Sequence, residues 1–221
     1  KTKLIHDKAT AGLRTVAVRM PKSKIFLEII SLIQKPVAAP SANKSGYITS
    51  TNAAHVKESF GDNLKIIIDS GKSTLGLEST IIDMTKKPYL IRRLGVIIKE
   101  DILNTLGIDT ILFNSSISSN RPNSPGQLSK HYSPKTPLIL NITKPKKDEA
   151  FLAFGKQLNE HDFMLNLSVD GNLKEAAHNL YDYLRRLDKM KKKRIVVSPV
   201  PYQGIGEAIN ERLNRASQKN D

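Results

Sequence analysis

Apolar residues follow two different spacings along this chain, and the spacing changes several times. Helical spacing predicts helices at 23–34, 51–59, 99–106, 173–187 and 206–216. Short apolar runs bounded by turn residues predict strands at 14–19, 36–39, 64–69, 79–84, 89–93, 138–142, 151–154, 163–167 and 195–197. We expect Ser23 to cap the first helix, residues 49–51 to cap the second, and Gly107 to end the third. Alternating strands and helices favour an α/β protein.

Residues 114–136 interrupt this pattern. They are rich in Ser, Asn, Pro and Gly and show no apolar periodicity, as is typical of a linker. The segment ends with His131-Tyr-Ser-Pro134, and aromatic and imidazole groups are unusual in a plain tether, so we expect this linker to dock. The chain then divides into residues 1–108, a linker at 109–136 and a C-terminal unit at 137–221. Strands alternating with helices in the last unit predict a small Rossmann-like domain with a mostly parallel sheet.

Composition and charge limit the chemistry. The 221 residues contain no cysteine, which excludes disulfides, thiolate metal sites and thiol nucleophiles. The five histidines are scattered without metal-ligand spacing, so we expect no protein metal site. The apolar runs are too short to span a bilayer, and we expect a cytoplasmic protein with no membrane partner. The net charge of +14 favours anionic partners such as nucleotides and tRNA.

The most informative stretch is 37–46, Val-Ala-Ala-Pro-Ser-Ala-Asn-Lys-Ser-Gly. An apolar run ends at a proline and is followed by small hydroxyl, amide and glycine residues. Such a loop can bring its backbone close to a phosphate or a ribose. The alternative is an ordinary turn in which a hydroxyl caps the next helix. Gly204-Ile-Gly206 is a weaker phosphate-loop pattern, because it lacks the full glycine fingerprint, and it favours a structural turn.

Several motifs occur in a recognisable order: Thr15–Arg19, Pro40-Ser-Ala-Asn43, Gly76-Leu-Glu-Ser-Thr80, Arg93, and Ser124-Pro-Gly followed by His131-Tyr-Ser-Pro134. With these motifs, from about residue 10 to residue 216, the chain closely resembles the two-domain threonylcarbamoyl-AMP synthases. The resemblance implies an incomplete YrdC-like twisted α/β domain at 1–108, followed by the linker and the small Rossmann-like domain. The patterns Ala176-Ala…Leu180-Tyr and Gly204-Ile-Gly-Glu-Ala-Ile209 agree with it.

The resemblance also implies a reaction. Members of the family convert ATP, L-threonine and bicarbonate into threonylcarbamoyl-AMP and pyrophosphate. The product serves the N6-threonylcarbamoylation of adenosine in tRNA, which a separate transferase complex completes. We therefore expect ATP as a substrate, magnesium with it, and tRNA as a partner through the basic surface. Neither chemical step needs a cysteine or a covalent intermediate, so no residue is assigned as catalytic.

Each binding residue is expected by its position in a matching motif. The ATP contacts implied are Thr15, Ser41, Thr49, Arg93 and Tyr132. The L-threonine contacts implied are Arg19, Ala39 and Ser79, with Arg19 on the carboxylate and Ala39 acting through its backbone. Tyr132 would fold over the nucleotide as a lid, and we expect the linker that carries it to be exposed. Asn43 and Glu78 belong to the same motifs but are left off the site, as an Asx turn and a salt-bridged loop carboxylate.

The chain departs from the family pattern at its start, and this departure leaves two interpretations of its function open. Family members have a long segment before the position of Lys1, with a basic motif for the triphosphate and several core strands. We therefore expect about half of an active site here and a sheet that lacks strands. The first reading is a synthase whose activity as this chain alone is open. The alternative is a non-catalytic remnant that binds RNA or a tRNA-modification partner. A generic Rossmann nucleotide-binding protein is weaker, because the glycine fingerprint is absent.

Overall fold

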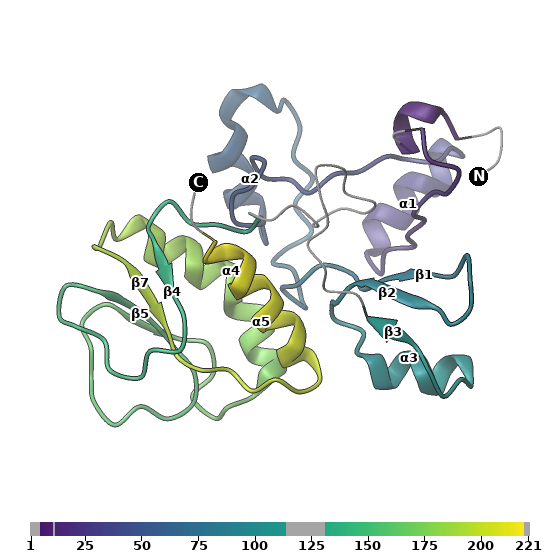
Figure 1. Cartoon of the computed structure of the whole chain (residues 1–221). Helices are drawn as coiled ribbons and strands as arrows, with labels where there is room; N and C mark the ends of the chain where they lie inside the picture. Colours follow the sequence, from purple (N-terminus) through teal and green to yellow (C-terminus); the bar gives the residue numbers. More distant parts are fainter. Residues whose placement is uncertain (1–4, 11, 114–130, 219–221) are drawn as a thin grey trace.

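The fold consists of two sheets with their helices, joined through one shared core. A computed structural model describes residues 5–10, 12–113 and 131–218. In Figure 1 the C-terminal sheet with its two long helices lies on one side, and a smaller sheet with one helix lies on the other. The helices α1 and α2 lie above them. The observed architecture is α/β, as the sequence predicts.

The N-terminal part contains the elements η1 (Asp7–Thr10), α1 (Lys24–Ile33), α2 (Ala53–Phe60), η2 (Gly61–Asn63), β1 (Ile81–Asp83), β2 (Leu90–Arg93), α3 (Lys99–Leu106) and β3 (Leu112–Phe113). The C-terminal part contains β4 (Leu138–Ile139), β5 (Ala150–Ala153), β6 (Met164–Asn166), α4 (Leu173–Lys189), β7 (Ile195–Val197) and α5 (Ile205–Ala216). The first sheet has the order β1-β2-β3, with an antiparallel and a parallel pair. The second has the order β4-β7-β5-β6 and is parallel throughout.

The helix ends follow the capping chemistry of the sequence. The Ser23 hydroxyl accepts a hydrogen bond from the Phe26 N–H at 3.3 Å, so α1 begins where it is expected. Gly107 ends α3 in the left-handed region, with φ 59° and ψ 41°. The cap of α2 is Asn52, whose side chain accepts from the His55 N–H, so the expectation of a cap at 49–51 is wrong by one position.

Three expected strands are absent. Residues 14–19, 36–39 and 64–69 have no strand structure, and none pairs with another described segment. A strand forms only when a neighbour accepts and donates its backbone hydrogen bonds, whatever its side chains favour. The apolar side chains that would have packed on such a sheet stay in solvent: Val18 is 86% exposed and Ile66 is 81% exposed. The helix α1 likewise contains no buried residue.

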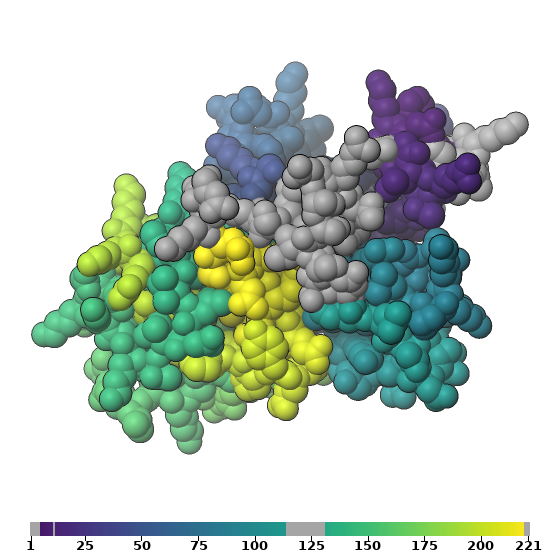
Figure 2. Space-filling view, viewed as in Figure 1, coloured from purple at the N-terminus to yellow at the C-terminus, as the bar shows by residue number. Residues whose placement is uncertain are grey.

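A single hydrophobic core connects the two parts of the chain. Leu77, Ile91 and Leu94 of the first part lie in the same cluster as Leu180 and Ile209 of the second. Figure 2 shows the residues of α5, in yellow, between the green C-terminal sheet unit and the teal unit of β1–β3 and α3. Helices α4 and α5 therefore contact both parts, and they carry polar groups to the motifs of the first part.

Candidate functional site

The motif Gly76-Leu-Glu-Ser-Thr80 is held close against two neighbouring backbones. Gly76 has φ +69°, and a β-carbon there would lie 2.1 Å from the Ala177 carbonyl oxygen on α4. A β-carbon at Gly95 would lie 2.4 Å from both the Glu78 carbonyl oxygen and the Thr80 nitrogen. Only glycine permits either approach. The loop thus lies between α4 and the end of β2, which fixes where Glu78 and Ser79 point.

Arg93, at the end of β2, holds the backbone of this loop. Its Nε and Nη2 atoms donate to the Ser79 carbonyl oxygen at 3.1 and 2.9 Å. Burial lowers the pKa of Arg93, while the nearby Glu78 carboxylate opposes that change. The expected ATP residue Arg93 and the expected threonine residue Ser79 are therefore in direct contact. Their ligand roles stay predictions.

Glu78 lies at the centre of the site. Its carboxylate accepts hydrogen bonds from the Thr49 hydroxyl at 2.8 Å, the Tyr181 hydroxyl at 2.9 Å and Arg212 Nε at 3.0 Å. Burial raises the pKa of Glu78, but the guanidinium groups of Arg212 and Arg93 and these hydrogen bonds outweigh it, so the pKa lies below its usual value. The carboxylate is therefore ionised and connects a predicted ATP residue to the C-terminal helices.

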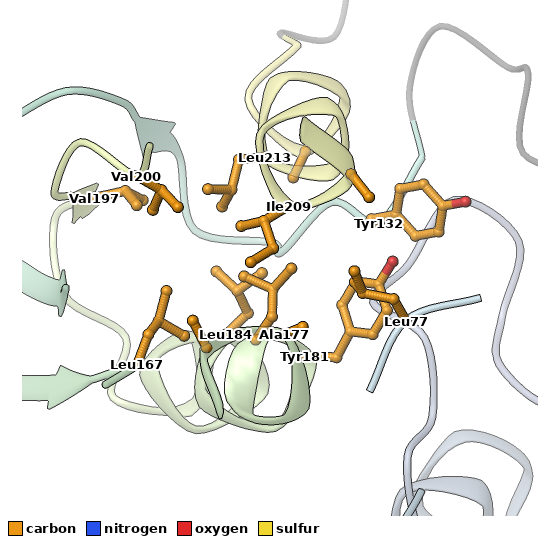
Figure 3. Packing of buried hydrophobic residues seen from close by; sticks show 14 of the residues in the cluster. Leu77, Tyr132, Leu167, Ala177, Tyr181, Leu184, Val197, Val200, Ile209 and Leu213 are labelled. Atoms are coloured by element: carbon orange, nitrogen blue, oxygen red, sulfur yellow. The ribbon is translucent and has the colours of Figure 1, made fainter. Parts of the chain in front are cut away.

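Tyr132 is buried, and the expectation of an exposed linker is wrong at this residue. Its side chain is 1% exposed and stacks on Tyr181, with ring centroids 5.6 Å apart and planes 23° apart (Figure 3). The Arg212 guanidinium carbon lies 5.1 Å from the Tyr132 ring centroid. Burial raises the pKa of Tyr132 to about 12. The end of the linker docks at Tyr132 because α4 supplies an aromatic ring and α5 supplies a cation. The motif Ser124-Pro-Gly126 lies outside the described residues.

The segment after Asn43 is fixed from α4. The buried Arg185 donates from Nη2 to the Ile48 carbonyl oxygen at 2.5 Å and from Nε to the Thr49 carbonyl oxygen at 3.4 Å. Its guanidinium carbon also lies 4.9 Å from the Tyr47 ring centroid. Thr49 is thus held at its hydroxyl by Glu78 and at its carbonyl by Arg185. This places one predicted ATP residue between groups from both parts of the chain.

Four expected site residues are not joined to this cluster. Thr15, Arg19, Ala39 and Ser41 are exposed and lie in segments without regular secondary structure. Within the ranges that the structure describes, no side-chain hydrogen bond or ion pair is found for Thr15, Arg19 or Ser41. The structure therefore assembles Thr49, Ser79, Arg93 and Tyr132, whereas the other four predicted contacts are exposed and lie outside this cluster. All eight ligand roles stay predictions.

Among the described residues, three buried polar atoms near the motifs have no hydrogen-bond partner. They are Asn43 Oδ1, His131 Nδ1 and Ser133 Oγ, and none has a hydrogen bond to the described part of the chain. The Asn43 amide nitrogen does donate, to the Lys44 and Tyr47 carbonyl oxygens at 2.8 and 3.1 Å. Burying an unsatisfied acceptor is costly, so these atoms mark a place for water or a ligand. Asn43, set aside at first as an Asx turn, is a further candidate for the site.

Sequence reasoning missed the residues that hold the cluster from the second part of the chain. These are Tyr181, Arg185 and Arg212, and the two arginine side chains are each 1% exposed. One signal was available for Arg212, which occurs among the apolar positions Ile209 and Leu213 of its predicted helix. A buried arginine needs acceptors, but the sequence alone did not indicate which ones. The alternative given for Glu78, a salt-bridged loop carboxylate, agrees with its ion pair to Arg212.

A basic cavity of about 370 Å³ lies elsewhere at the junction of the two parts. Its lining residues are Tyr47, Glu58, Lys135, Thr136, Asp188, Lys189, Lys191 and Lys192. The Asp188 carboxylate is already used, since it accepts from the Tyr47 hydroxyl at 2.9 Å and the Thr136 N–H at 2.8 Å. Lys189 pairs with Glu58 at 2.9 Å. Lys135 and Lys191 have no ion pair with the described residues, so the cavity is positively charged.

The described residues provide neither a cluster of metal ligands nor a membrane-spanning helix. Across residues 5–10, 12–113 and 131–218, no group of three or more His, Asp or Glu side chains is placed to hold a metal ion. In the same ranges, no helix has the length and apolar character needed to cross a membrane.

Comparison with known proteins places the chain in a family. Residues 97–218 match the family described as threonylcarbamoyl-AMP synthase, C-terminal domain, and residues 1–95 match the one described as telomere recombination, Sua5/YciO/YrdC. The threonylcarbamoyl-AMP synthase of Pyrococcus abyssi is 33% identical over 98% of this chain and 68% of its own length. This chain belongs to the threonylcarbamoyl-AMP synthase family. The Bacillus subtilis synthase is 31% identical, over 98% of this chain and 67% of its own length.

Solved structures agree with this assignment. The crystal structure of Pyrococcus abyssi Sua5 complexed with L-threonine superposes with a TM-score of 0.87 at 32% identity, covering 98% of this chain and 68% of that one. A variant of the same protein, with a histidine and the following tyrosine changed to alanine, gives a TM-score of 0.85 at 30% identity, covering 98% and 67%. The resemblance and the fold class expected from the motifs are therefore confirmed. The chain spans about two thirds of these relatives' lengths.

Proposed function

We propose that this chain is a threonylcarbamoyl-AMP synthase that supplies the N6-threonylcarbamoyladenosine modification of tRNA. The observation that carries the proposal is the joining of Thr49, Ser79, Arg93 and Tyr132 around the Glu78 carboxylate. The relatives that match almost the whole chain bear that name, and one of them is solved with L-threonine.

The reaction needs little covalent participation by the protein. The amine of threonine forms a C–N bond to the carbon of bicarbonate, and the hydroxyl of bicarbonate leaves with the amine proton as water, which gives a carbamate. A carbamate oxygen then attacks the α-phosphorus of ATP, and pyrophosphate leaves with the electron pair of the broken P–O bond. Binding the two substrates in line, beside cationic groups, supplies most of the required rate acceleration. The half-buried Arg93 is one such cation.

The proposed contacts divide between the two substrates. ATP would contact Thr15, Ser41, Thr49, Arg93 and Tyr132, and L-threonine would contact Arg19, Ala39 and Ser79. The direct hydrogen bonds from Arg93 to the Ser79 backbone support adjoining substrate sites. A guanidinium such as that of Arg19 can bind both oxygens of a carboxylate. The domain limits 1–108, 109–136 and 137–221 also remain a proposal.

The test is pyrophosphate release from ATP that depends on both threonine and bicarbonate. One arm uses this chain alone, and a second adds the segment that the resemblance implies before Lys1. Release in the first arm supports a synthase that is active as the chain stands. Release only in the second supports a synthase whose active site needs that segment. No release in either arm contradicts the proposal.

Magnesium is proposed only as a companion of ATP. The described residues offer no metal site of their own, so they give no fit for a resident magnesium ion. The magnesium concentration needed for activity should then rise with the ATP concentration, as expected of an ion bound by the triphosphate. Chelation with EDTA and titration with magnesium at several ATP concentrations measure this dependence.

The second candidate function is RNA binding without catalysis, and the basic cavity favours it. Lys135 and Lys191 line that cavity with no acidic partner in the described ranges. Phosphates of tRNA would fit such a surface, and binding would weaken steeply with salt. The names of the relatives favour the synthase, and RNA contact is compatible with it. Lys135→Glu with Lys191→Glu should weaken binding of a tRNA anticodon stem-loop, measured by fluorescence anisotropy.

A cytoplasmic location and transfer of the product to a separate complex complete the synthase proposal.

A further inference from the structure

Glu78 connects three side chains that come from distant parts of the chain. The carboxylate is bonded to Thr49, which is 29 residues earlier, to Tyr181, which is 103 residues later, and to Arg212, which is 134 residues later. Both carboxylate oxygens are used, and the side chain is 14% exposed. A carboxylate that is bonded so completely has a single position.

The two C-terminal partners of Glu78 are also the residues that hold Tyr132. Tyr181 stacks on the Tyr132 ring, and the Arg212 guanidinium lies over it. In Figure 3 the rings of Tyr132 and Tyr181 lie side by side, next to Leu77, the residue before Glu78. A change at Glu78 therefore reaches Tyr132 through either partner.

Arg212 extends the connection to the end of β2. Its Nη2 donates to the Leu94 carbonyl oxygen at 2.7 Å, one residue after Arg93. Its other bonds go to Glu78 and to Glu211 on the same helix. The arginine is 1% exposed, so without Glu78 its charge keeps a single carboxylate partner, Glu211. One helix α5 residue thus contacts both segments that carry the predicted site.

We propose that Glu78 is a positioning residue that makes the geometry of the substrate site depend on the docking of the C-terminal helices. It orients Thr49 directly and orients Tyr132 through Tyr181 and Arg212. This inference rests on the proposed function, since it takes Thr49 and Tyr132 to be nucleotide contacts. When α4 and α5 are bonded to Glu78, Thr49 and Tyr132 have one arrangement. When those bonds are lost, the two residues are no longer held in it.

A purely structural ion pair would behave differently from a positioning residue. Loss of a structural pair lowers thermal stability and leaves nucleotide affinity unchanged in the fraction of protein that stays folded. Loss of a positioning residue weakens nucleotide binding in protein that is fully folded. Affinity and local order are therefore measured beside stability.

The variants are Glu78→Gln, which keeps the shape and removes the charge, and Tyr181→Phe, which removes one hydroxyl and keeps the stacked ring. The matched control is Asp83→Asn, which breaks the ion pair of Asp83 with Arg92 at 2.6 Å, outside the cluster. Each is measured for affinity toward a non-hydrolysable ATP analogue by calorimetry and for hydrogen exchange at residues 46–50 and 131–136. Melting temperatures identify any variant that fails to fold.

We expect Glu78→Gln to weaken the affinity about tenfold and Tyr181→Phe to weaken it several-fold, by loss of hydrogen bonds to a charged group. The double variant should lose affinity by a factor smaller than the product of the two single-variant factors, because both changes act on the same set of contacts. Exchange should rise in both segments for Glu78→Gln and not for Asp83→Asn. If Tyr181→Phe and Glu78→Gln keep the affinity and local exchange of the unchanged protein, the proposal is overturned.

The two proposals fail in different ways. If the ATP analogue binds neither to the unchanged protein nor to the protein with the segment added before Lys1, the proposed function falls, and hydrogen exchange without nucleotide decides whether Glu78 orders the two segments. If the unchanged protein binds and the variants bind equally well, the function stands and the positioning role is wrong. If Glu78→Gln does not fold, Tyr181→Phe carries the same comparison.

Discussion

The burial of Tyr132 leads to a prediction about stability that differs from that for an exposed lid. Changing Tyr132 to Ala removes a ring that is 1% exposed, and emptying a buried aromatic site costs about 3–5 kcal/mol. Stacking on Tyr181 and the contact with the Arg212 cation each contribute about 1 kcal/mol to the stability, and part of this is already counted in the cost of removing the ring. We therefore expect a loss of about 4 kcal/mol in the free energy of unfolding.

Tyr132 also has a left-handed backbone, with φ 64°. A non-glycine residue there costs about 1 kcal/mol, which packing of the ring must offset. Alanine has the same backbone cost at this φ but lacks the packing of the ring, so the backbone does not reduce the loss of stability. In a chain of 221 residues, a loss of 4 kcal/mol lowers the melting temperature by about 8–16 °C.

The assay is urea unfolding followed by circular dichroism, with calorimetry for the melting temperature. Tyr202→Ala is the matched control, because Tyr202 is exposed and its loss should change stability by less than about 0.5 kcal/mol. Tyr132→Phe keeps the ring and should stay close to the unchanged protein. An unfolding midpoint for Tyr132→Ala equal to that of Tyr202→Ala would show that the ring is not packed as described.

Three other outcomes are expected. Arg93→Ala should weaken ATP binding while the protein stays folded, measured by calorimetry; unchanged affinity would remove Arg93 from the site. Glu78, whose pKa is depressed in the folded state, stabilises the protein above its usual pKa of 4.5, and this contribution is lost as pH falls below that value. Acid unfolding of Glu78→Gln should therefore be less steep than that of the unchanged protein. Backbone amides of 64–69 should exchange much faster than those of β5, because they have no ladder; equal protection would contradict the absence of a strand there.

The C-terminal half could be predicted because its signals are local. β7 occupies the predicted residues 195–197, and α4 begins at the predicted Leu173 and extends two residues past the predicted end. A helix satisfies its own hydrogen bonds, so an apolar stripe and a cap decide most of it. The strands of this sheet found partners because α4 returns the chain from β6 at one edge to β7, which pairs with β4 and β5.

The N-terminal half could not be predicted in the same way. Residues 14–19 and 64–69 have the composition of strands, but a strand depends on a neighbour that composition does not specify. For the same reason the motifs indicated candidate residues without indicating which groups those residues contact. The bond between Glu78 and Arg212 spans 134 residues, and no local pattern indicates it.

The Glu78–Arg212 pair also bears on why the C-terminal unit belongs to the site. A buried ion pair adds little net stability, because desolvation of both charges offsets their attraction, and apolar residues of similar size often serve as well. The stability of the junction is supplied instead by the shared core around Leu77, Tyr181 and Ile209. What an apolar replacement cannot supply is an acceptor for the Thr49 hydroxyl and a cation over the Tyr132 ring. The charges at this junction are therefore better explained by the order that they impose on Thr49 and Tyr132 than by the strength with which they join the two units.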